Sequence, residues 1–328
     1  MNDNSTIPLT DEELGKFEQG MSKCMSCNNW NDVSDKEVLK EYDCQFCDST
    51  IFCPFRISEF WLYDVMGSGG MGSVYRAQQY NDPKVYAIKI SEYADECEFR
   101  FQSLLYEGNI IMDLEHDHIP YAYRFGHKHG NAFLLMDFEP GLTLDTFIAT
   151  YQFSEDDLMS WMIQLAETLK FMATKGYIYR DLKPQNIIIQ NEKLILVDFG
   201  LAMHLDHADD IDEDNLVGSP SYIPPERILG KPEDIRSDIY ALGMVFYYVA
   251  HGHNYFEGSP QEIVQGHLHE YRYPLLELNP EMPPDLAALF DKILSHHAED
   301  RYQTYDDLIN DLNKLLEESL SLELCWNS

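Results

Sequence analysis

The chain has 328 residues, with 57 Asp and Glu against 23 Lys and Arg, and its formal net charge is −34. Apolar residues make up 45% and aromatic residues 13%, which argues against wholesale disorder. The acidity argues against two classes of partner, nucleic acid and anionic membrane surfaces, because both require many Lys and Arg side chains. A salt-adapted surface and a preference for basic substrates would both account for it.

The sequence shows no sign of membrane insertion or secretion. The longest apolar run, residues 239–250, is too short for a membrane span and is typical of a core helix. The first residues have neither the basic nor the apolar region of a secretory signal. We therefore expect a cytoplasmic protein in which the seven cysteines are metal ligands or buried thiols rather than disulfides.

Composition divides the chain into four segments. Residues 1–19 are polar and acidic and predict a mobile arm or one short helix. Residues 20–57 contain five of the seven cysteines and few aliphatic side chains, so this segment needs a covalent or metal staple to fold. Residues 58–316 have a globular composition, and residues 317–328 are a C-terminal tail.

The globular segment begins with strands and continues with helices. Apolar patterns predict strands at 60–66, 73–77, 85–90 and 132–138, and short strands at 187–189 and 194–197. Helices are predicted at 96–114, 154–175 and around 237–250, with amphipathic helices beyond. This order predicts an α+β protein with two lobes, residues 58–136 and 140–316.

A glycine cluster separates the first two predicted strands. Residues 67–72 match the pattern G-x-G-x-x-G, which also occurs in dinucleotide-binding turns. In those turns a helix follows, whereas here residues 74–77 favour a strand. The glycines therefore predict a hairpin tip whose backbone N–H groups can approach phosphate oxygens, with a plain mobile turn as the alternative.

Charged side chains stand at the ends or in the middle of the buried strands. Lys89 lies among apolar residues and needs a carboxylate or phosphate partner, for which Glu107 on the next helix is the candidate. Asp181, Lys183 and Asn186 precede the strand at 187–189. Asp198 follows the strand at 194–197, where a carboxylate is well placed to bind a cation.

In order and spacing, these motifs resemble those of eukaryotic-type protein kinases, and the Gly-Gly-Met-Gly tip is most similar to the bacterial Hanks-like serine/threonine branch. The resemblance covers about residues 58–316 and implies a bilobal fold with a β-rich N-lobe and a helical C-lobe. It implies transfer of the ATP γ-phosphate to protein hydroxyls with Mg²⁺ or Mn²⁺. A pseudokinase scaffold that only binds nucleotide and partners is the alternative.

The resemblance also assigns the ATP site. The residues that would cover the phosphates are Gly67, Ser68, Gly69, Gly70 and Gly72. The residues that would surround the adenine are Val74, Ala87 and Ile188, with Met136 as the gatekeeper and Asp137 to Glu139 as the hinge.

For catalysis, the resemblance implies that Lys89 holds the α- and β-phosphates and pairs with Glu107. Asp181 would orient and deprotonate the substrate hydroxyl, and Lys183 would neutralise the γ-phosphate. Lys183, two residues after the base, is the feature that favours Ser/Thr over Tyr as the acceptor. The metal ligands would be Asn186 and Asp198.

Two positions depart from the family pattern. Tyr179 replaces the usual His before the catalytic Arg-Asp, and we expect it to serve through packing and hydrogen bonding. Pro224-Pro225-Glu226 replaces Ala-Pro-Glu, and we expect Glu226 to pair with Arg301. We also expect Asp238 to brace the backbone of the catalytic loop.

The segment that usually carries an activating phosphate lacks a hydroxyl. In the family, an arginine at the position of Arg180 commonly pairs with a phosphorylated residue, but residues 199–217 contain no Ser, Thr or Tyr. The segment is acidic, which predicts either a solvated loop or a carboxylate, Glu213 or Asp214, that pairs with Arg180.

Two C-x-x-C pairs lie in the cysteine-rich segment. Cys24, Cys27, Cys44 and Cys47 match the zinc pattern C-x₂-C-x₁₅₋₂₀-C-x₂-C and resemble a zinc ribbon or rubredoxin-like module. Four thiolates around a structural Zn²⁺ would stabilise the segment, with iron as the alternative ion. Free buried thiols remain an alternative, Cys53 could replace a ligand, and we expect the module to recruit partners or to regulate.

Overall fold

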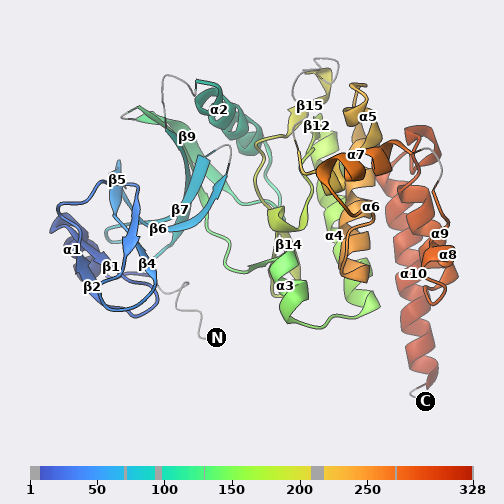
Figure 1. Cartoon of the computed structure of the whole chain (residues 1–328), viewed down its shortest axis with the longest axis horizontal. Helices are drawn as coiled ribbons and strands as arrows, with labels where there is room; N and C mark the ends of the chain where they lie inside the picture. Colours follow the sequence, from blue (N-terminus) through green and yellow to red (C-terminus); the bar gives the residue numbers. More distant parts are fainter. Residues whose placement is uncertain are drawn as a thin grey trace. The chain divides into compact units, whose positions relative to one another are not determined.

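The computed structural model describes residues 8–69, 72–92, 98–128, 130–207, 218–269 and 272–326. The chain forms two compact units (Figure 1). The first contains the residues up to Met112 together with Pro120–Pro140, and the second contains Asp113–Ile119 and the residues from Gly141 onward. Within the described ranges, no helix combines the length and the apolar character that crossing a membrane requires. As the sequence predicted, the first unit is rich in strands and the second in helices.

One antiparallel sheet organises the first unit. Its order is β5-β6-β7-β8-β10-β9, and its strands are β5 (Phe55–Ile57), β6 (Phe60–Gly69), β7 (Gly72–Gln79), β8 (Tyr86–Glu92), β9 (Ala122–Lys128) and β10 (Asn131–Asp137). Tyr75, Ile88 and Leu135, on three adjacent strands, belong to a shared core that covers one face of the sheet. The side chains between them point to the opposite face, because successive residues of a strand alternate sides.

The N-terminal segment is built onto this sheet. It contains α1 (Asp11–Glu18) and two short hairpins, β1 (Met21–Lys23) with β2 (Trp30–Asp32) and β3 (Glu41–Asp43) with β4 (Thr50–Phe52). A capping box between Thr10 and Glu13 starts α1. Phe17 of α1 packs against Trp61 and Tyr63 of β6. One short helix therefore forms within residues 1–19.

A buried glutamine fastens the same segment to β7. Gln78 accepts a hydrogen bond from the Leu9 N–H at 2.9 Å and donates one to the Leu9 carbonyl at 2.7 Å. Its side chain thus satisfies both backbone groups of one residue, as a paired strand would.

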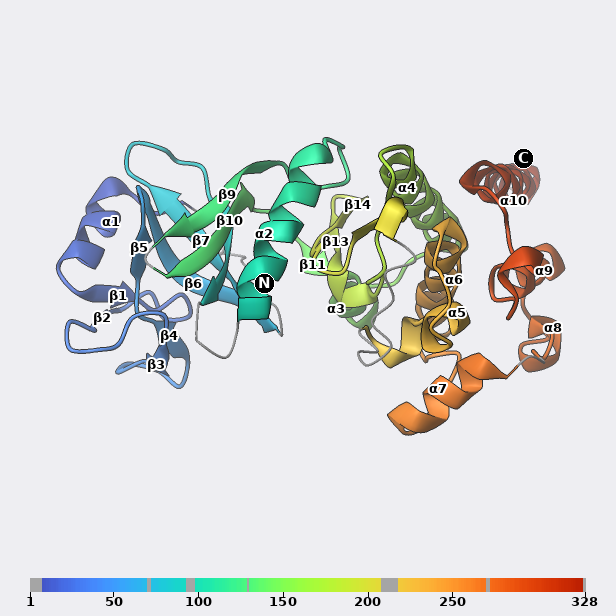
Figure 2. The same ribbon diagram turned by 90° about the horizontal axis from the view of Figure 1, so that it is seen from above.

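The helix α2 (Glu98–Asp113) lies beside the sheet in both views (Figures 1 and 2). Gly108 allows this approach, because a Cβ atom there would lie 2.4 Å from the Phe125 ring of β9. The sequence did not predict β9, which lies at the sheet edge and has mostly half-exposed side chains.

The second unit is built around two long helices, α4 (Glu155–Thr174) and α6 (Ile235–His251), which contact each other. Ser154 caps α4 through a capping box with Asp157, and Asp234 caps α6. α10 (Tyr305–Trp326) also contacts α4. The remaining helices are α3 (Leu144–Thr150), α5 (Pro225–Ile228), α7 (Pro260–Leu268), α8 (Leu275–Leu278) and α9 (Pro284–Ile293).

Two small sheets carry the loops of the second unit. One consists of β11 (Leu142–Thr143), β13 (Ile187–Gln190) and β14 (Lys193–Leu196), and the other pairs β12 (Tyr177–Ile178) with β15 (Met203–His204). The segment 179–186 runs from β12 to β13, and Asp198 follows β14.

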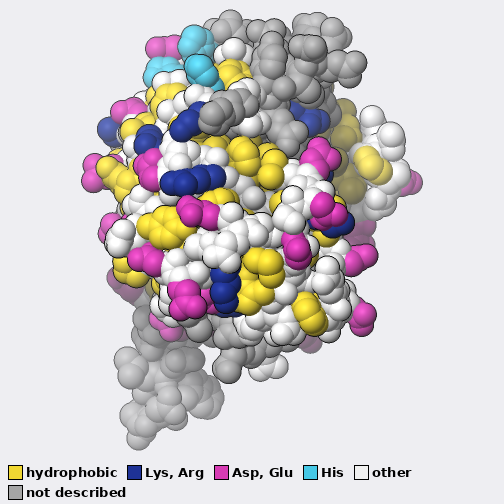
Figure 3. Space-filling model, turned by 90° about the vertical axis from the view of Figure 1, so that its left-hand side faces the viewer, with side chains coloured by type: hydrophobic (Ala, Val, Ile, Leu, Met, Phe, Trp, Pro, Cys, Tyr) yellow, Lys and Arg dark blue, Asp and Glu magenta, His cyan; other side chains and the backbone are white. Residues whose placement is uncertain are grey.

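The surface of the first unit carries mixed charge. Seen from the side of α1 and β1, acidic side chains are spread over the face, with Lys and Arg side chains among them (Figure 3). Among the described residues of this face, Lys and Arg side chains are therefore interspersed with acidic and hydrophobic ones.

Candidate functional site

The glycine cluster forms a hairpin, as the sequence predicted. Gly67, Ser68 and Gly69 of β6 pair with Val74, Ser73 and Gly72 of β7. Nothing lies within 4 Å of a Cβ atom built on Gly67 or Gly69. A ligand oxygen could therefore approach the backbone of this strand closely.

Gly72 has a different role. Its φ is 134°, and a Cβ atom there would lie 2.3 Å from the Ile90 carbonyl oxygen, so the close approach of β7 to β8 requires glycine. Gly70, also predicted to cover phosphates, lies outside the described residues.

The predicted adenine-contacting residues of the first unit share one face of the sheet. Val74 pairs with Lys89, and Ala87 pairs with Met136. Because directly paired residues point to the same side, these four side chains lie on the face opposite the core of Tyr75, Ile88 and Leu135. Ile188 belongs to the second unit, on β13.

Asp137, predicted to lie in the hinge, is held by two side chains to which the sequence did not point. Tyr123 donates to its carboxylate at 2.6 Å, and Lys84 lies 2.6 Å from the same oxygen. No sequence pattern pointed to Tyr123, because it lies on β9, a strand that was not predicted. Glu139 lies in the loop after β10 and is half-exposed.

Lys89 and Glu107 form the expected ion pair. The Lys89 Nζ lies 2.9 and 2.7 Å from the two carboxylate oxygens of Glu107. Both side chains are almost fully buried, with residue exposures of 4% and 1%. A buried pair of this kind is costly to desolvate and is poor evidence for a purely stabilising role.

In the second unit, Asp181 is the centre of a hydrogen-bonded cluster. Its Oδ2 accepts from Lys183 Nζ at 2.7 Å and from Asn186 Nδ2 at 2.9 Å. Burial raises the pKa of the Asp181 carboxyl and the negative charge of Asp198 adds to this, while Lys183 and Asn186 oppose it. The cluster holds a carboxylate in a fixed orientation, as a proton acceptor requires.

The predicted metal ligands fit a hard cation. Because the Asn186 Nδ2 donates to Asp181, the ligand atom that Asn186 offers is its oxygen Oδ1. The Val197 N–H donates to the Asn186 carbonyl, so the residue before Asp198 is bound to the loop that carries Asn186. Amide and carboxylate oxygens suit Mg²⁺.

Tyr179 performs the role expected of it. Its hydroxyl donates to the Val197 carbonyl at 2.6 Å, and its ring packs edge-on against Phe199. Asp238 braces the same loop, accepting from the backbone N–H groups of Tyr179 and Arg180 at 2.6 and 2.8 Å. Burial raises the pKa of Asp238 to about 6.

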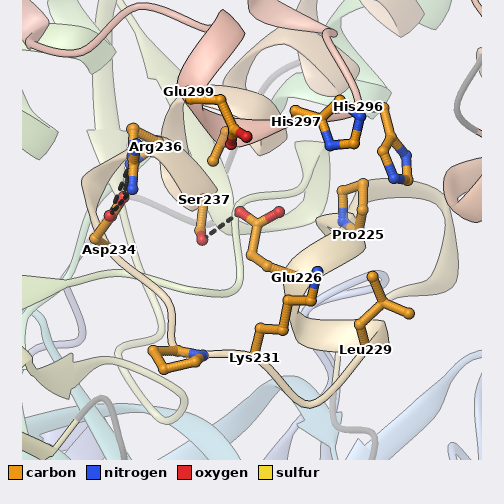
Figure 4. Close-up of a pocket in the computed structure, with 12 residues that line it drawn as sticks. Pro225, Glu226, Leu229, Lys231, Asp234, Arg236, Ser237, His296, His297 and Glu299 are labelled. Atoms are coloured by element: carbon orange, nitrogen blue, oxygen red, sulfur yellow. Dashed lines mark hydrogen bonds and ion pairs between the residues drawn. The ribbon is translucent and has the colours of Figure 1, made fainter.

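Glu226 and Arg301 form the expected ion pair, with contacts of 2.8 and 2.9 Å. Beside it lies a pocket of about 300 Å³, lined by α5, the start of α6 and the segment 296–299 (Figure 4). None of the residues predicted to bind ATP lines this pocket. It is therefore separate from the predicted nucleotide site.

Arg180 pairs with a carboxylate that the sequence did not point to. Its Nε and Nη2 atoms lie 2.9 and 2.7 Å from the Glu233 Oε1. Glu213 and Asp214, the predicted partners, lie outside the described residues. No short-range pattern marks Glu233, since it lies 53 residues further along the chain.

The four predicted metal-binding cysteines converge. Their Sγ atoms all lie within 4.8 Å of one another, and the pairs Cys24–Cys47 and Cys27–Cys44 are 3.7 Å apart. Disulfides would require about 2.05 Å. A tetrahedral site with Zn–S bonds of about 2.3 Å has edges of about 3.8 Å, so the arrangement fits a four-thiolate metal site.

Neighbouring donors support these sulfurs. The buried Asn31 donates to Cys44 Sγ at 3.6 Å, and the Phe46 N–H donates to the same sulfur at 3.5 Å. Burial tends to raise the pKa of the Cys44 thiol, but these hydrogen bonds outweigh it and lower the pKa. Asn31 was missed because it lies outside both C-x-x-C pairs. Cys53 is buried nearby but stands outside the group of four.

The comparisons with known proteins agree with this geometry. The family model described as "Protein kinase domain" matches residues 60–312. A probable serine/threonine-protein kinase of Clostridium perfringens is 30% identical over 268 residues, covering 80% of this chain and 39% of the relative. The serine/threonine-protein kinase PrkC of Bacillus subtilis is 30% identical over 265 residues, covering 78% of this chain and 40% of the relative.

A similar match extends to eukaryotes. The serine/threonine-protein kinase ULK3 of Homo sapiens is 30% identical over 258 residues, covering 77% of this chain and 54% of the relative. The chain spans about two fifths of the length of the first bacterial relatives, at 39% and 40%. On the extent of the family match, this chain belongs to the protein kinase family.

Proposed function

We propose that this chain is a serine/threonine protein kinase that transfers the γ-phosphate of ATP to protein hydroxyl groups. The observation that carries the proposal is the Asp181 carboxylate, which Lys183 and Asn186 hold in one orientation. The names of the relatives, which are serine/threonine-protein kinases, support the choice of acceptor.

In this proposal, the first unit supplies groups that bind the phosphates of ATP. The exposed backbone at Gly67 and Gly69 approaches the phosphates, and Lys89, held by Glu107, binds the α- and β-phosphates. Asp181 orients the substrate hydroxyl and accepts its proton, while Lys183 offsets the charge of the γ-phosphate.

Asn186 and Asp198 hold a divalent cation, Mg²⁺ or Mn²⁺. When bound, the cation neutralises phosphate charge and fixes the phosphate orientation. The substrate class that we propose is basic protein segments, because the net charge of −34 attracts cations and repels acidic partners.

The test is phosphate incorporation by the purified full chain with Mg²⁺ and ATP, using one basic and one acidic test protein. We expect phosphoserine or phosphothreonine on the basic protein. Asp181→Asn should lower kcat by more than about 100-fold, because it removes the proton acceptor. The matched control Asp285→Asn changes an exposed aspartate of α9 and should retain activity.

A second pair of variants tests the lysine that is proposed to bind the phosphates. Lys89→Ala should abolish transfer, whereas the control Lys175→Ala, at an exposed lysine, should not. Wild-type protein that binds ATP but incorporates no phosphate would contradict the proposal and favour the pseudokinase alternative.

We further propose that the four cysteines bind one structural Zn²⁺, and that the module supports the sheet of the first unit. The sulfur spacing supports a tetrahedral ion, and the packing of Phe17 on Trp61 and Tyr63 supports the structural role. A reducing compartment such as the cytoplasm suits four thiolates. Elemental analysis should find about one zinc per chain. If the protein contains iron instead, the bound ion is iron. If it contains neither zinc nor iron, the proposed metal site is refuted.

A further inference from the structure

Arg180, the residue before the proposed catalytic base, has an uncommon backbone conformation. Its φ is 70°, in the left-handed region that residues other than glycine seldom adopt. Such a conformation persists only where the surroundings hold it in place. The direction of the chain entering Asp181 therefore depends on the contacts of Arg180.

Three anchors hold this residue. Its backbone N–H donates to Asp238 Oδ1 at 2.8 Å, and its carbonyl accepts from Arg227 Nη1 at 2.7 Å. Its guanidinium donates to Glu233 Oε1 through both Nε and Nη2. The N–H, the carbonyl and the side chain are thus each bound to a different residue.

Glu233 joins two of these anchors. Its carboxylate, 5% exposed, also accepts from Arg227 through Nε at 2.9 Å and Nη2 at 2.7 Å. It therefore fixes the Arg180 side chain directly and the Arg180 carbonyl through Arg227. Both guanidinium groups bind the Glu233 carboxylate, whereas the Asp238 carboxylate binds the backbone N–H of Arg180, and the four side chains together carry no net charge.

We propose that Glu233 is a positioning residue for catalysis, which holds Arg180 and thereby the Asp181 backbone in their working arrangement. This rests on the proposed kinase function. The counter-ion of Arg180 is part of the fold, just before α6, and residues 199–217 offer no hydroxyl for a phosphate. Activity should therefore not depend on phosphorylation of that segment.

The test compares Glu233→Gln with Glu277→Gln, a matched change at an exposed glutamate of α8. We expect Glu233→Gln to lower kcat by about 10- to 100-fold, as displacement of a catalytic group does, with the KM for ATP within about twofold of wild type. Hydrogen exchange of the peptide 177–186 should accelerate in Glu233→Gln only. The N–H groups of Tyr179 and Arg180 donate to Asp238, and these two hydrogen bonds are held less rigidly once the Arg180 side chain is released.

A double variant separates positioning from simple charge balance. Arg227→Gln with Glu233→Gln removes one positive and one negative charge, so the net charge of the cluster stays that of the wild type, and Arg227→Gln alone measures the loss of the donor to the Arg180 carbonyl. If Glu233 positions Arg180, the double variant has a lower kcat than Arg227→Gln alone, because the Arg180 side chain has also lost its fixed partner. If Glu233 only neutralises Arg227, the double variant has the same kcat as Arg227→Gln alone, and the proposal is overturned.

The outcomes distinguish this inference from the proposed function. An active wild type together with unchanged kcat and exchange in Glu233→Gln would overturn the inference alone. An inactive wild type would refute the kinase function, and the exchange measurement would still decide whether Glu233 orders the loop.

Discussion

The replacement of Arg301 by lysine gives a sharp test of the second unit's core. The Arg301 side chain is 0% exposed, and all five of its N–H groups are used. They donate to Glu226 Oε1 and Oε2 and to the carbonyl oxygens of Ser295, Arg236 and His296, at 2.8 to 3.0 Å. Lysine keeps the charge but offers only three donors from one atom.

At least two of the five acceptors, which are partly buried, must therefore lose their donor. An unsatisfied buried acceptor costs about 1–3 kcal/mol, so we expect Arg301→Lys to destabilise the second unit by about 3 kcal/mol. For a unit of this size, about 2–4 °C per kcal/mol converts the loss into a Tm decrease of about 6–12 °C.

The assay is calorimetry of the full chain, with hydrogen exchange of α6 peptides to assign the transition to the second unit. Arg236→Lys is the matched control, because the Arg236 side chain is 29% exposed and pairs with the half-exposed Asp234. That variant should lose less than about 1 kcal/mol. Equal Tm decreases in the two variants would refute the argument from donor number.

Three further predictions follow from other parts of the molecule. Cys44→Ser should lose the metal, because three thiolates do not close a structural tetrahedral site, whereas Cys53→Ser should retain it in the same metal analysis. Phe17→Ala should cost about 3–5 kcal/mol in urea unfolding followed by the fluorescence of Trp30 and Trp61, and an unchanged midpoint would show that α1 does not support the sheet. The pKa of Asp181 is raised by burial, so kcat, which requires the carboxylate, should fall on acidification at a higher pH than an ordinary aspartate with a pKa of 3.8 allows; a pH–rate profile with no such shift would contradict this.

The main elements of the sheet were predictable because their side chains follow simple periods. β8 and β10 each contain a short apolar run, and residues Ala132–Leu135 of β10 are all buried. β9 was not predictable in this way, because Arg124, His127 and Lys128 lie at the exposed edge and give no apolar alternation. For α1, the pair Thr10 and Glu13 is a capping box that would have favoured a helix over a mobile arm.

The ion pairs divide in the same way. The pairs Lys89–Glu107 and Glu226–Arg301 were predictable because each lies in a motif with a known order along the chain. The bond between Arg180 and Glu233 was not, since two charged residues 53 positions apart meet only through tertiary packing. Asn31 escaped for a similar reason, because an isolated asparagine has no pattern until the fold brings it to a sulfur.

The fastening of Leu9 by Gln78 has a consequence for the order of folding. The two residues are 69 positions apart, so the bonds cannot form until β7 has been synthesised and paired. The hairpins that carry the four cysteines close over shorter distances, and local contacts form faster than distant ones. We therefore expect thiolate binding of metal to precede the burial of Trp61 when the denatured chain refolds, with α1 docking last.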